Sequence, residues 1–352
     1  MKRHYQDDKD KFDAEGCRVV WSSDANEPLY EETLRIPAGT TQIPEGAYAD
    51  QLALTEVIVP EGVTVIGRNA FSGCSRLRRI ALPEGLLRIE GGAFADCTCL
   101  REVALPASLK VIGGAAQALQ VSEKPYREKF IEVCGGAFEG CTALEGIVLP
   151  AGLRSIGVRA FSGCRNLQEA TLPEGLQELG GGAFCATALT EAHLPASLRE
   201  IGGARQEESD NDYFRGMPEP RCPGCFQDCT ALVRVTFPEG LEVIGAEAFS
   251  GCTALMEAHF PQSIAKIGGG AFRNCTALHT AVLPRKPVMI ATGVPWLGYE
   301  ETDCYGAFFG CASLVHVTLP DPGGLYPLGT CMADAFHGCP CLRDMQQPAD
   351  NA

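Results

Sequence analysis

The chain has 352 residues, of which 45% are hydrophobic, and a formal net charge of −15 at pH 7. This acidity excludes the basic face that nucleic-acid binding requires and favours solubility, with basic partners as a secondary implication. No segment approaches the roughly 18 apolar residues that span a bilayer, and the charged start lacks the apolar core of a signal peptide. The composition therefore predicts a soluble intracellular protein, or a surface or secreted one if further residues precede Met1.

The first segment, residues 1–33, reads as a polar leader. Residues 1–16 are charged and show no periodicity, so we expect them to be disordered. Cys17 to Trp21 is rich in β-prone residues and could form an N-terminal cap strand.

A repeat begins near Leu34 and continues to Leu342, followed by a polar tail over residues 343–352. Its template reads A-F-x-x-C-x-x-L-x-x-[IVA]-x-L-P-x-x-L-x-x-I-G, and many copies are 23 residues apart. The aromatic position recurs eleven times, at Tyr48, Phe71, Phe94, Phe138, Phe161, Phe184, Phe226, Phe249, Phe272, Phe308 and Phe336. Self-similarity at a fixed period predicts a solenoid, in which each unit buries its apolar face against its neighbours.

Each unit divides into segments of different periodicity. Stretches such as Arg79 to Leu82 alternate polar and apolar residues, which predicts a half-buried strand that ends at the following proline. The L-x-x-I-G part predicts a second short extended segment that ends in a glycine turn. The A-F-x-x-C-x-x-L part has a spacing of three to four residues and predicts one helical turn with the aromatic ring in the core.

Four segments depart from this register, and we interpret them as insertions. They cover residues 114–136, 203–224, 285–305 and 321–334. A degenerate coil is an alternative for the first, because Phe130 and Val133 precede Ala137 at template spacing. The unit that starts at Ala183 is one residue short between Phe184 and Leu189.

Half of the 18 cysteines occupy one template position, three residues after the aromatic residue. They are Cys74, Cys97, Cys141, Cys164, Cys229, Cys252, Cys275, Cys311 and Cys339. Neighbouring coils lie about 4.8 Å apart, which is wider than the roughly 3.8 Å between the Cβ atoms of a disulfide. We therefore expect a ladder of reduced, buried thiols that pack as small apolar side chains.

The template resembles the BspA-type leucine-rich repeat, and Ala70-Phe71, Cys74, Leu77 and Ile80 carry its first complete copy. The resemblance covers nearly the whole of residues 34–342. It implies a β-rich, right-handed solenoid of about eleven units with a parallel sheet along one face. Relatives of this type are often surface adhesins or host-binding proteins.

In the predicted sheet, residues that alternate with buried Ile and Leu point outward in two rows. One row is Glu56, Arg79, Glu102, Gly146, Glu169, Glu191, Arg234, Glu257, Thr280 and His316. The other is Ile58, Ala81, Ala104, Val148, Thr171, His193, Thr236, His259, Val282 and Thr318. Such a flat, mixed surface suits a protein or peptide ligand, although each side chain alone could simply keep the face soluble. We predict that the charged residues and histidines of both rows bind the partner, together with Trp296 as an exposed anchor in an insertion. They are Glu56, Arg79, Glu102, Glu169, Glu191, Arg234, Glu257 and His316 in the first row, and His193 and His259 in the second.

Two further groups of residues could carry chemistry. Glu191/His193 and Glu257/His259 could each form an acid/base or metal pair, but their units are not adjacent, so four ligands cannot easily converge. Cys222 and Cys225 form a C-x-x-C turn that could bind zinc or exchange disulfides. Cys225 also fills the template Ala position, which is a structural explanation for it.

No catalytic or cofactor fingerprint appears in the sequence. We therefore expect no enzyme activity, cofactor or metal, and predict a protein-interaction scaffold that binds through the sheet face and the insertions. One alternative is a secreted or surface adhesin that recognises host matrix protein or glycan, which an upstream signal peptide would support. The other is a zinc or redox protein acting through Cys222 and Cys225, which elemental analysis would test.

Overall fold

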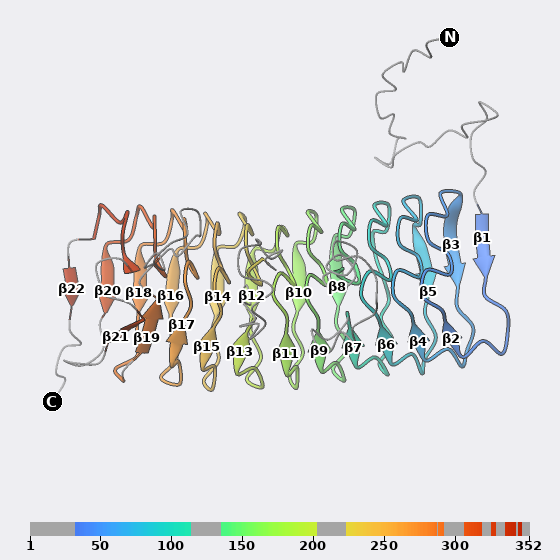
Figure 1. Ribbon diagram of the computed structural model, residues 1–352, viewed down its shortest axis with the longest axis horizontal. Coiled ribbons are helices and arrows are strands. Elements are labelled where there is room, and N and C mark those ends of the chain that lie inside the picture. Colours follow the sequence, from blue (N-terminus) through green and yellow to red (C-terminus); the bar gives the residue numbers. More distant parts are fainter. Residues whose placement is uncertain are drawn as a thin grey trace, which may run out of the picture.

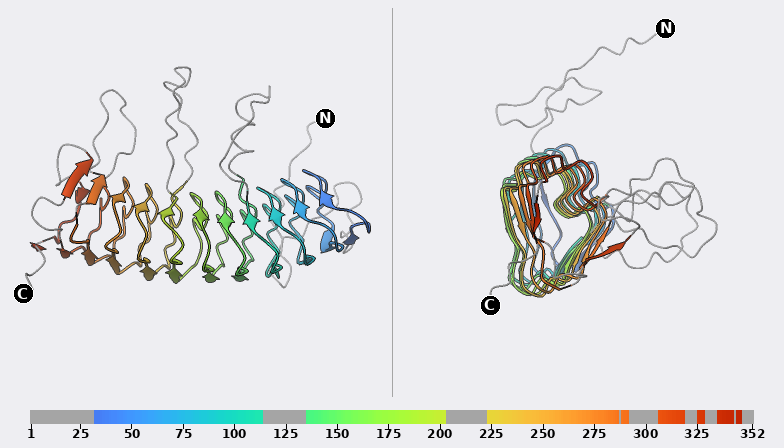
Figure 2. Two further views of the ribbon diagram at one scale, coloured as in Figure 1. Left: turned by 90° about the horizontal axis from the view of Figure 1, so that it is seen from below. Right: turned by 90° about the vertical axis from the view of Figure 1, so that its left-hand side faces the viewer.

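The coils of the chain stack side by side along the long axis of the molecule (Figure 1). The computed structural model describes residues 32–113, 135–202, 223–286, 288–291, 306–318, 325–328, 335–342 and 344–346. Within these residues most coils contribute two kinds of short strand, which form two rows of parallel sheet along the stack (Figure 2). The predicted β-solenoid is therefore confirmed.

The first row of sheet contains the strands that follow the template pattern of Arg79 to Leu82. These are β1 (Glu32–Arg35), β3 (Leu54–Ile58), β5 (Arg79–Ala81), β8 (Gly146–Val148), β10 (Glu169–Thr171), β12 (Glu191–His193), β14 (Arg234–Thr236), β16 (Glu257–His259), β18 (Thr280–Val282), β20 (His316–Thr318) and β22 (Asp344–Gln346). We call this row the first sheet.

The second row contains the strands of the L-x-x-I-G part. These are β2 (Gln42–Ile43), β4 (Val65–Ile66), β6 (Arg88–Ile89), β7 (Val111–Ile112), β9 (Ser155–Ile156), β11 (Glu178–Leu179), β13 (Glu200–Ile201), β15 (Val243–Ile244), β17 (Lys266–Ile267), β19 (Val288–Ala291) and β21 (Leu325–Leu328). We call this row the second sheet.

The aromatic residues form one continuous column inside the stack. All eleven rings stack on their neighbours, with centroids 5.2–5.6 Å apart and planes within 15° of parallel. Nine of the phenylalanines are among the largest fully buried side chains. Burying one such side chain stabilises a fold by about 1.5–3 kcal/mol, so this column is a major source of the cohesion between coils.

The cysteine ladder lies beside this column. Each of the nine predicted thiols is free, and its Sγ donates a hydrogen bond of 3.0–3.3 Å to the carbonyl oxygen of the aromatic residue in the preceding coil. In the shortened unit Thr187 stands at the ladder position, but its Oγ1 donates to the Phe184 carbonyl of its own coil and lies 3.2 Å from Cys229 Sγ. The ladder thiols therefore supply hydrogen-bond donors to buried backbone carbonyl groups, which an apolar side chain at the same position could not do.

The segment predicted to be a helical turn is a succession of separate turns. In the second coil, the amides of Cys74 and Leu77 each donate to the carbonyl three residues earlier. The residue two positions after the aromatic has a positive φ in every unit: Asp50, Gly73, Asp96, Gly140, Gly163, Ala186, Asp228, Gly251, Asn274, Gly310 and Gly338. A left-handed residue cannot continue a helix of L-residues, so the prediction of a helical turn is wrong.

Glycine is required at this position wherever the previous coil carries Asp or Asn. A Cβ added to Gly140 would overlap Asp96 Oδ1 of the preceding coil, and its φ is +72°. The same relation joins Asp50 to Gly73, Asp228 to Gly251 and Asn274 to Gly310. A coil with Asp or Asn at this position is therefore followed by a coil with Gly there in these four places.

The turns after the strand-ending prolines fit together in a similar way. At two places a Pro-Glu-Gly turn is followed by a Pro-Ala-Ser turn in the next coil, and the second pair begins at Pro173 and Pro195. Ser197 Oγ accepts from the Gly175 amide at 3.0 Å and donates to the Leu176 carbonyl at 2.6 Å. Glu174 Oε2 in turn accepts from the Ala196 amide at 3.1 Å. Where these two turns are neighbours, their side chains thus join the coils by hydrogen bonds.

Two of the predicted insertions are shorter than expected. β19 and β21 lie within residues 285–305 and 321–334, and they continue the second sheet, with Ile290 opposite Ile267 and Pro327 opposite Ile290. Pro287 occupies the template position of Leu86, which hid this register in the sequence. Most of each predicted insertion lies outside the described residues, and so does the possible cap strand at Cys17–Trp21 in the leader.

The alternative of a degenerate coil in residues 114–136 is wrong. Phe94 stacks directly on Phe138 at 5.2 Å, and Ile112 of β7 pairs with Ile156 of β9. These contacts leave no room for another coil between them. The proposed Phe130 and Val133 positions themselves lie outside the described residues.

The first sheet is interrupted at several places. Residues 102–105 form no strand, although their exposed and buried side chains still alternate. β10 and β12 are neighbours without ladder hydrogen bonds. β14 and β16 are likewise neighbours without ladder hydrogen bonds, although no residue is missing from their units. Among the described residues, no helix is long and apolar enough to cross a bilayer.

Candidate functional site

The outer face of the first sheet brings most of the predicted binding residues into two aligned rows. Strand pairing places Glu56 opposite Arg79, and Glu191 opposite Arg234. In β5, β12, β14 and β16 the two outer residues are exposed and the middle one is buried. The structure therefore places these side chains as expected, while their role in binding stays a prediction.

Three of the predicted residues need a separate statement. His316 aligns with Thr280 and is exposed at the end of β20. Glu102 is exposed but lies in the segment without a strand. Trp296 lies outside the described residues.

A network of polar side chains joins β12 to β14. Glu191 Oε1 lies 3.3 Å from an Arg234 guanidinium nitrogen, and Glu191 Oε2 lies 3.3 Å from His193 Nε2. His193 Nδ1 is 3.2 Å from the Thr236 hydroxyl oxygen. The Glu191, His193 and Arg234 side chains are 45%, 67% and 69% exposed, so a partner can reach all of them.

The second acidic group lies on β16. Glu257 Oε2 is 2.9 Å from His259 Nε2, and both side chains are more than half exposed. This hydrogen bond, with the nearby charges of His259, His279 and Arg234, lowers the pKa of the Glu257 carboxyl group. Glu257 therefore stays ionised to a lower pH than an isolated glutamate. We call Glu191, His193, Arg234, Glu257, His259 and His279 the Glu–His cluster.

His279 was missed by the sequence analysis because it precedes β18 and belongs to neither outward row. It is exposed, and its Nδ1 lies 2.9 Å from the Thr280 hydroxyl oxygen. Its charge also acts on Glu257 of the neighbouring strand. The run His279-Thr280 beside an acidic strand is the sequence signal that could have identified it.

The geometry of the cluster suits recognition of charged groups and not metal ligation. Within the part of the chain that the structure describes, no group of three or more His, Cys, Asp or Glu could hold a metal ion. Each Glu–His pair lies on an open sheet surface. The pKa of Glu257 is lowered, whereas a carboxyl group that exchanges protons near neutral pH needs a raised pKa.

The Cys222–Cys225 turn does not have the environment of a reactive thiol site. Cys222 lies outside the described residues. Cys225 and Cys229 are fully buried, and burial raises the pKa of the Cys225 thiol well above 9.0 and that of Cys229 to about 12. Zinc ligation and disulfide exchange need thiolates, which form where the thiol pKa is lowered. Cys225 instead packs in the core at the position that alanine takes in the template.

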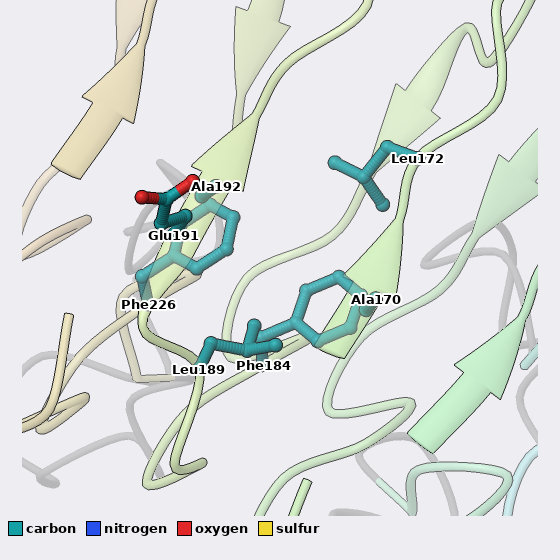
Figure 3. Close-up of a pocket in the computed structure, with 7 residues that line it drawn as sticks. All are labelled: Ala170, Leu172, Phe184, Leu189, Glu191, Ala192 and Phe226. Carbon is teal, nitrogen blue, oxygen red and sulfur yellow. The ribbon is translucent and has the colours of Figure 1, made fainter. Parts of the chain in front are cut away.

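A small crevice opens between β10 and β12, where the sheet is interrupted (Figure 3). It has no room for a water molecule and is lined by Ala170, Leu172, Phe184, Leu189, Glu191, Ala192 and Phe226. Glu191 contributes the only charged group, and Figure 3 shows its carboxylate beside Ala192. The crevice is open and too tight for a small-molecule ligand, so it is a packing gap left by the shortened unit.

Comparison with known proteins identifies the repeat. A family model described as the BspA type leucine rich repeat region (6 copies) matches residues 29–120, 126–208 and 222–294. A comparison with curated proteins gives no match.

Several solved structures are similar to the chain. A leucine-rich repeat protein from Bacteroides ovatus is 24% identical, over 88% of this chain and 85% of its own, with a TM-score of 0.41. A leucine-rich repeat protein from T. pallidum is 25% identical, over 64% and 78%, with a TM-score of 0.40. A leucine rich cell surface protein from Faecalibacterium prausnitzii is 22% identical, over 95% and 93%, with a TM-score of 0.47.

Proposed function

Since the chain belongs to the BspA-type leucine-rich repeat family, we propose that it is a non-enzymatic scaffold that binds a protein partner through the face of its first sheet. Stacked repeats create long, regular surfaces that bind macromolecules without a pocket. The inserted segments are proposed to assist this binding, on the strength of their sequence alone.

The observation that supports this proposal most is the alignment of exposed charged side chains across β12, β14 and β16. Glu191, Arg234 and Glu257 follow one another in the first row and are all accessible. Val148 on the same face is 82% exposed, and an aliphatic side chain in that position can contact a partner. Complementary charges on such a surface would orient a partner and increase its rate of association.

The test is simultaneous charge reversal on this face. The variant carries Glu169→Lys, Glu191→Lys, Arg234→Glu and Glu257→Lys. A partner is first identified by affinity purification with mass spectrometry, and its binding to purified wild-type and variant chains is then measured. We expect binding to be lost while the circular dichroism spectrum is retained, because all four side chains are exposed.

The second sheet offers a matched control with the same change in charge. Three acidic residues and one basic residue on or beside its strands are likewise exposed: Glu178, Glu200, Glu242 and Lys266. Reversing these four charges should leave binding unchanged. Unchanged binding in the first variant, or equal loss in both, would count against the sheet face as the binding surface.

A further inference from the structure

Histidines are concentrated on one stretch of the first sheet. Four of the six in the chain lie on or beside four of its strands, and all four are exposed. They are His193 on β12, His259 on β16, His279 before β18 and His316 on β20. Imidazole ordinarily titrates at about pH 6.5, so this stretch is where mild acid changes the charge of the face most.

Acidic side chains accompany these histidines. His193 and His259 lie 3.3 Å and 2.9 Å from the carboxylates of Glu191 and Glu257 on their own strands. His279 lies between Glu257 of β16 and His316 of β20. His316 aligns with Asp344 of β22, so it is not counted in the cluster.

The charged groups that surround the three remaining histidines determine the sign of the face. β10 contributes Glu169, β12 Glu191, β14 Arg234 and β16 Glu257. Three carboxylates and one guanidinium give this stretch a net charge of −2 when the imidazoles are neutral. Protonation of three imidazoles changes the net charge to +1, so the face changes sign.

We propose that the Glu–His cluster binds a basic, arginine-rich protein segment at neutral pH and releases it in mild acid. This inference rests on the proposed function, because it names the partner class and the regulation of the same surface. A basic partner is the one that fits a face whose first row carries more carboxylates than cations at neutral pH.

Release follows from competition within the cluster. At neutral pH the exposed carboxylates of Glu191 and Glu257 can accept from the guanidinium groups of a partner in addition to their contacts with Arg234, His193 and His259. When His193 and His259 become cations they pair with those carboxylates at distances already within 3.3 Å, with no loss of translational freedom. The new positive charges also repel the basic partner.

The probe for this proposal is a synthetic arginine–glycine repeat peptide, titrated calorimetrically into the full chain at pH 7.5 and pH 5.5. The lower value stays above the isoelectric point near 4.9, which limits precipitation. We expect the peptide to bind about tenfold more weakly at pH 5.5, from a few charge–charge terms in water that are partly screened by salt.

Variants separate the histidines from the rest of the acidic chain. Whatever its affinity at pH 7.5, the triple variant His193→Gln/His259→Gln/His279→Gln should change in affinity less than about twofold between pH 7.5 and pH 5.5, because the cluster then holds no imidazole. His337→Gln is the control, because His337 stacks on Phe309 at 5.3 Å away from the first sheet. This control should keep the tenfold change.

Further variants and outcomes locate the peptide. Glu191→Gln/Glu257→Gln should weaken binding at pH 7.5, and undiminished binding would place the peptide elsewhere and overturn the proposal. A tenfold change that persists in the triple variant, or equal wild-type affinity at both pH values, would also overturn it. In either of these cases the charge-reversal test with the natural partner still decides the proposed function independently. Absence of peptide binding at pH 7.5 overturns the basic-partner assignment alone.

Discussion

Alkaline pH should selectively remove the stabilising contribution of the cysteine ladder, and Cys275 is suited to testing this. Cys275 is fully buried, and its Sγ donates a 3.1 Å hydrogen bond to the Phe249 carbonyl. Burial raises the pKa of its thiol from 9.0 to about 12, against a smaller lowering effect of a backbone hydrogen bond. The thiol therefore stays protonated in the folded chain at pH values where the unfolded chain loses the proton.

The sign and size of the effect follow from this difference. Because the pKa is higher in the folded state, the contribution of Cys275 is complete below pH 9 and declines as the pH rises toward 12. The decline is about 1.4 kcal/mol for each pH unit. Raising the pH from 7.5 to 10 should thus lower the free energy of unfolding by about 1.4 kcal/mol through this one thiol.

A single substitution isolates the thiol from other groups that titrate in alkali. At pH 7.5, Cys275→Ala should cost about 1–2 kcal/mol, through a lost hydrogen bond and a small cavity. At pH 10 the wild type has lost about 1.4 kcal/mol through the thiol, so the cost of the substitution should fall below about 1 kcal/mol. Urea unfolding in reductant, followed by circular dichroism at both pH values, measures these differences.

Cys341 provides the control, because its thiol is exposed and lies outside the ladder. Cys341→Ala should change the free energy of unfolding equally little at both pH values. An equal cost of Cys275→Ala at pH 7.5 and pH 10 would refute the argument that burial keeps the ladder thiols protonated.

Two further predictions concern the turns and the sheet face. Gly140→Ala should destabilise the fold by about 1–3 kcal/mol, because Gly140 has a φ of +72° and an added Cβ would overlap Asp96. Gly146→Ala is the control, because there is open space around its Cβ, and it should not destabilise the fold. Similar urea midpoints for the two variants would contradict this prediction. His259→Gln should raise the pKa of Glu257 in a carboxyl NMR titration, because the imidazole hydrogen bond lowers it. Glu257 stabilises the fold above its unfolded pKa and loses that contribution as the pH falls through its lower folded pKa, and an unchanged titration would show that His259 is not the cause.

The repeat was readable from the sequence because the same physical requirement recurs in each coil. Phe71, Leu77 and Ile80 are buried in the structure, as their template positions predict. Side chains along a strand alternate between its two faces, so the sequence alone predicted that Arg79 and Arg234 lie on the outer face of the first sheet, where both are exposed. The count of eleven complete units stays a prediction, because parts of several coils lie outside the described residues.

The errors have identifiable physical causes. The spacing of Phe71, Cys74 and Leu77 fits a helical turn, but the left-handed residue between them, Gly73, prevents one. The recurrence of Gly, Asp and Asn at that position was visible in the sequence and would have indicated turns. In the candidate site, sequence patterns located Glu191 and His193 on one strand, but the contact of Glu191 with Arg234 depends on side-chain rotamers that no pattern specifies.

The chain can lengthen directly after a second-sheet strand, a position that we call a seam, without disturbing the stack. Residues 114–134, 203–222 and 292–305 all follow a second-sheet strand, namely β7, β13 and β19. Across each seam the coil contacts continue, as in the 2.7 Å hydrogen bond from the Phe94 amide to the Ala137 carbonyl. β7, β13 and β19 are each three coils apart, so the seams recur at about 14 Å, three strand spacings of about 4.8 Å. Foreign peptides grafted at these three positions would therefore be displayed along the stack at a spacing that the fold determines.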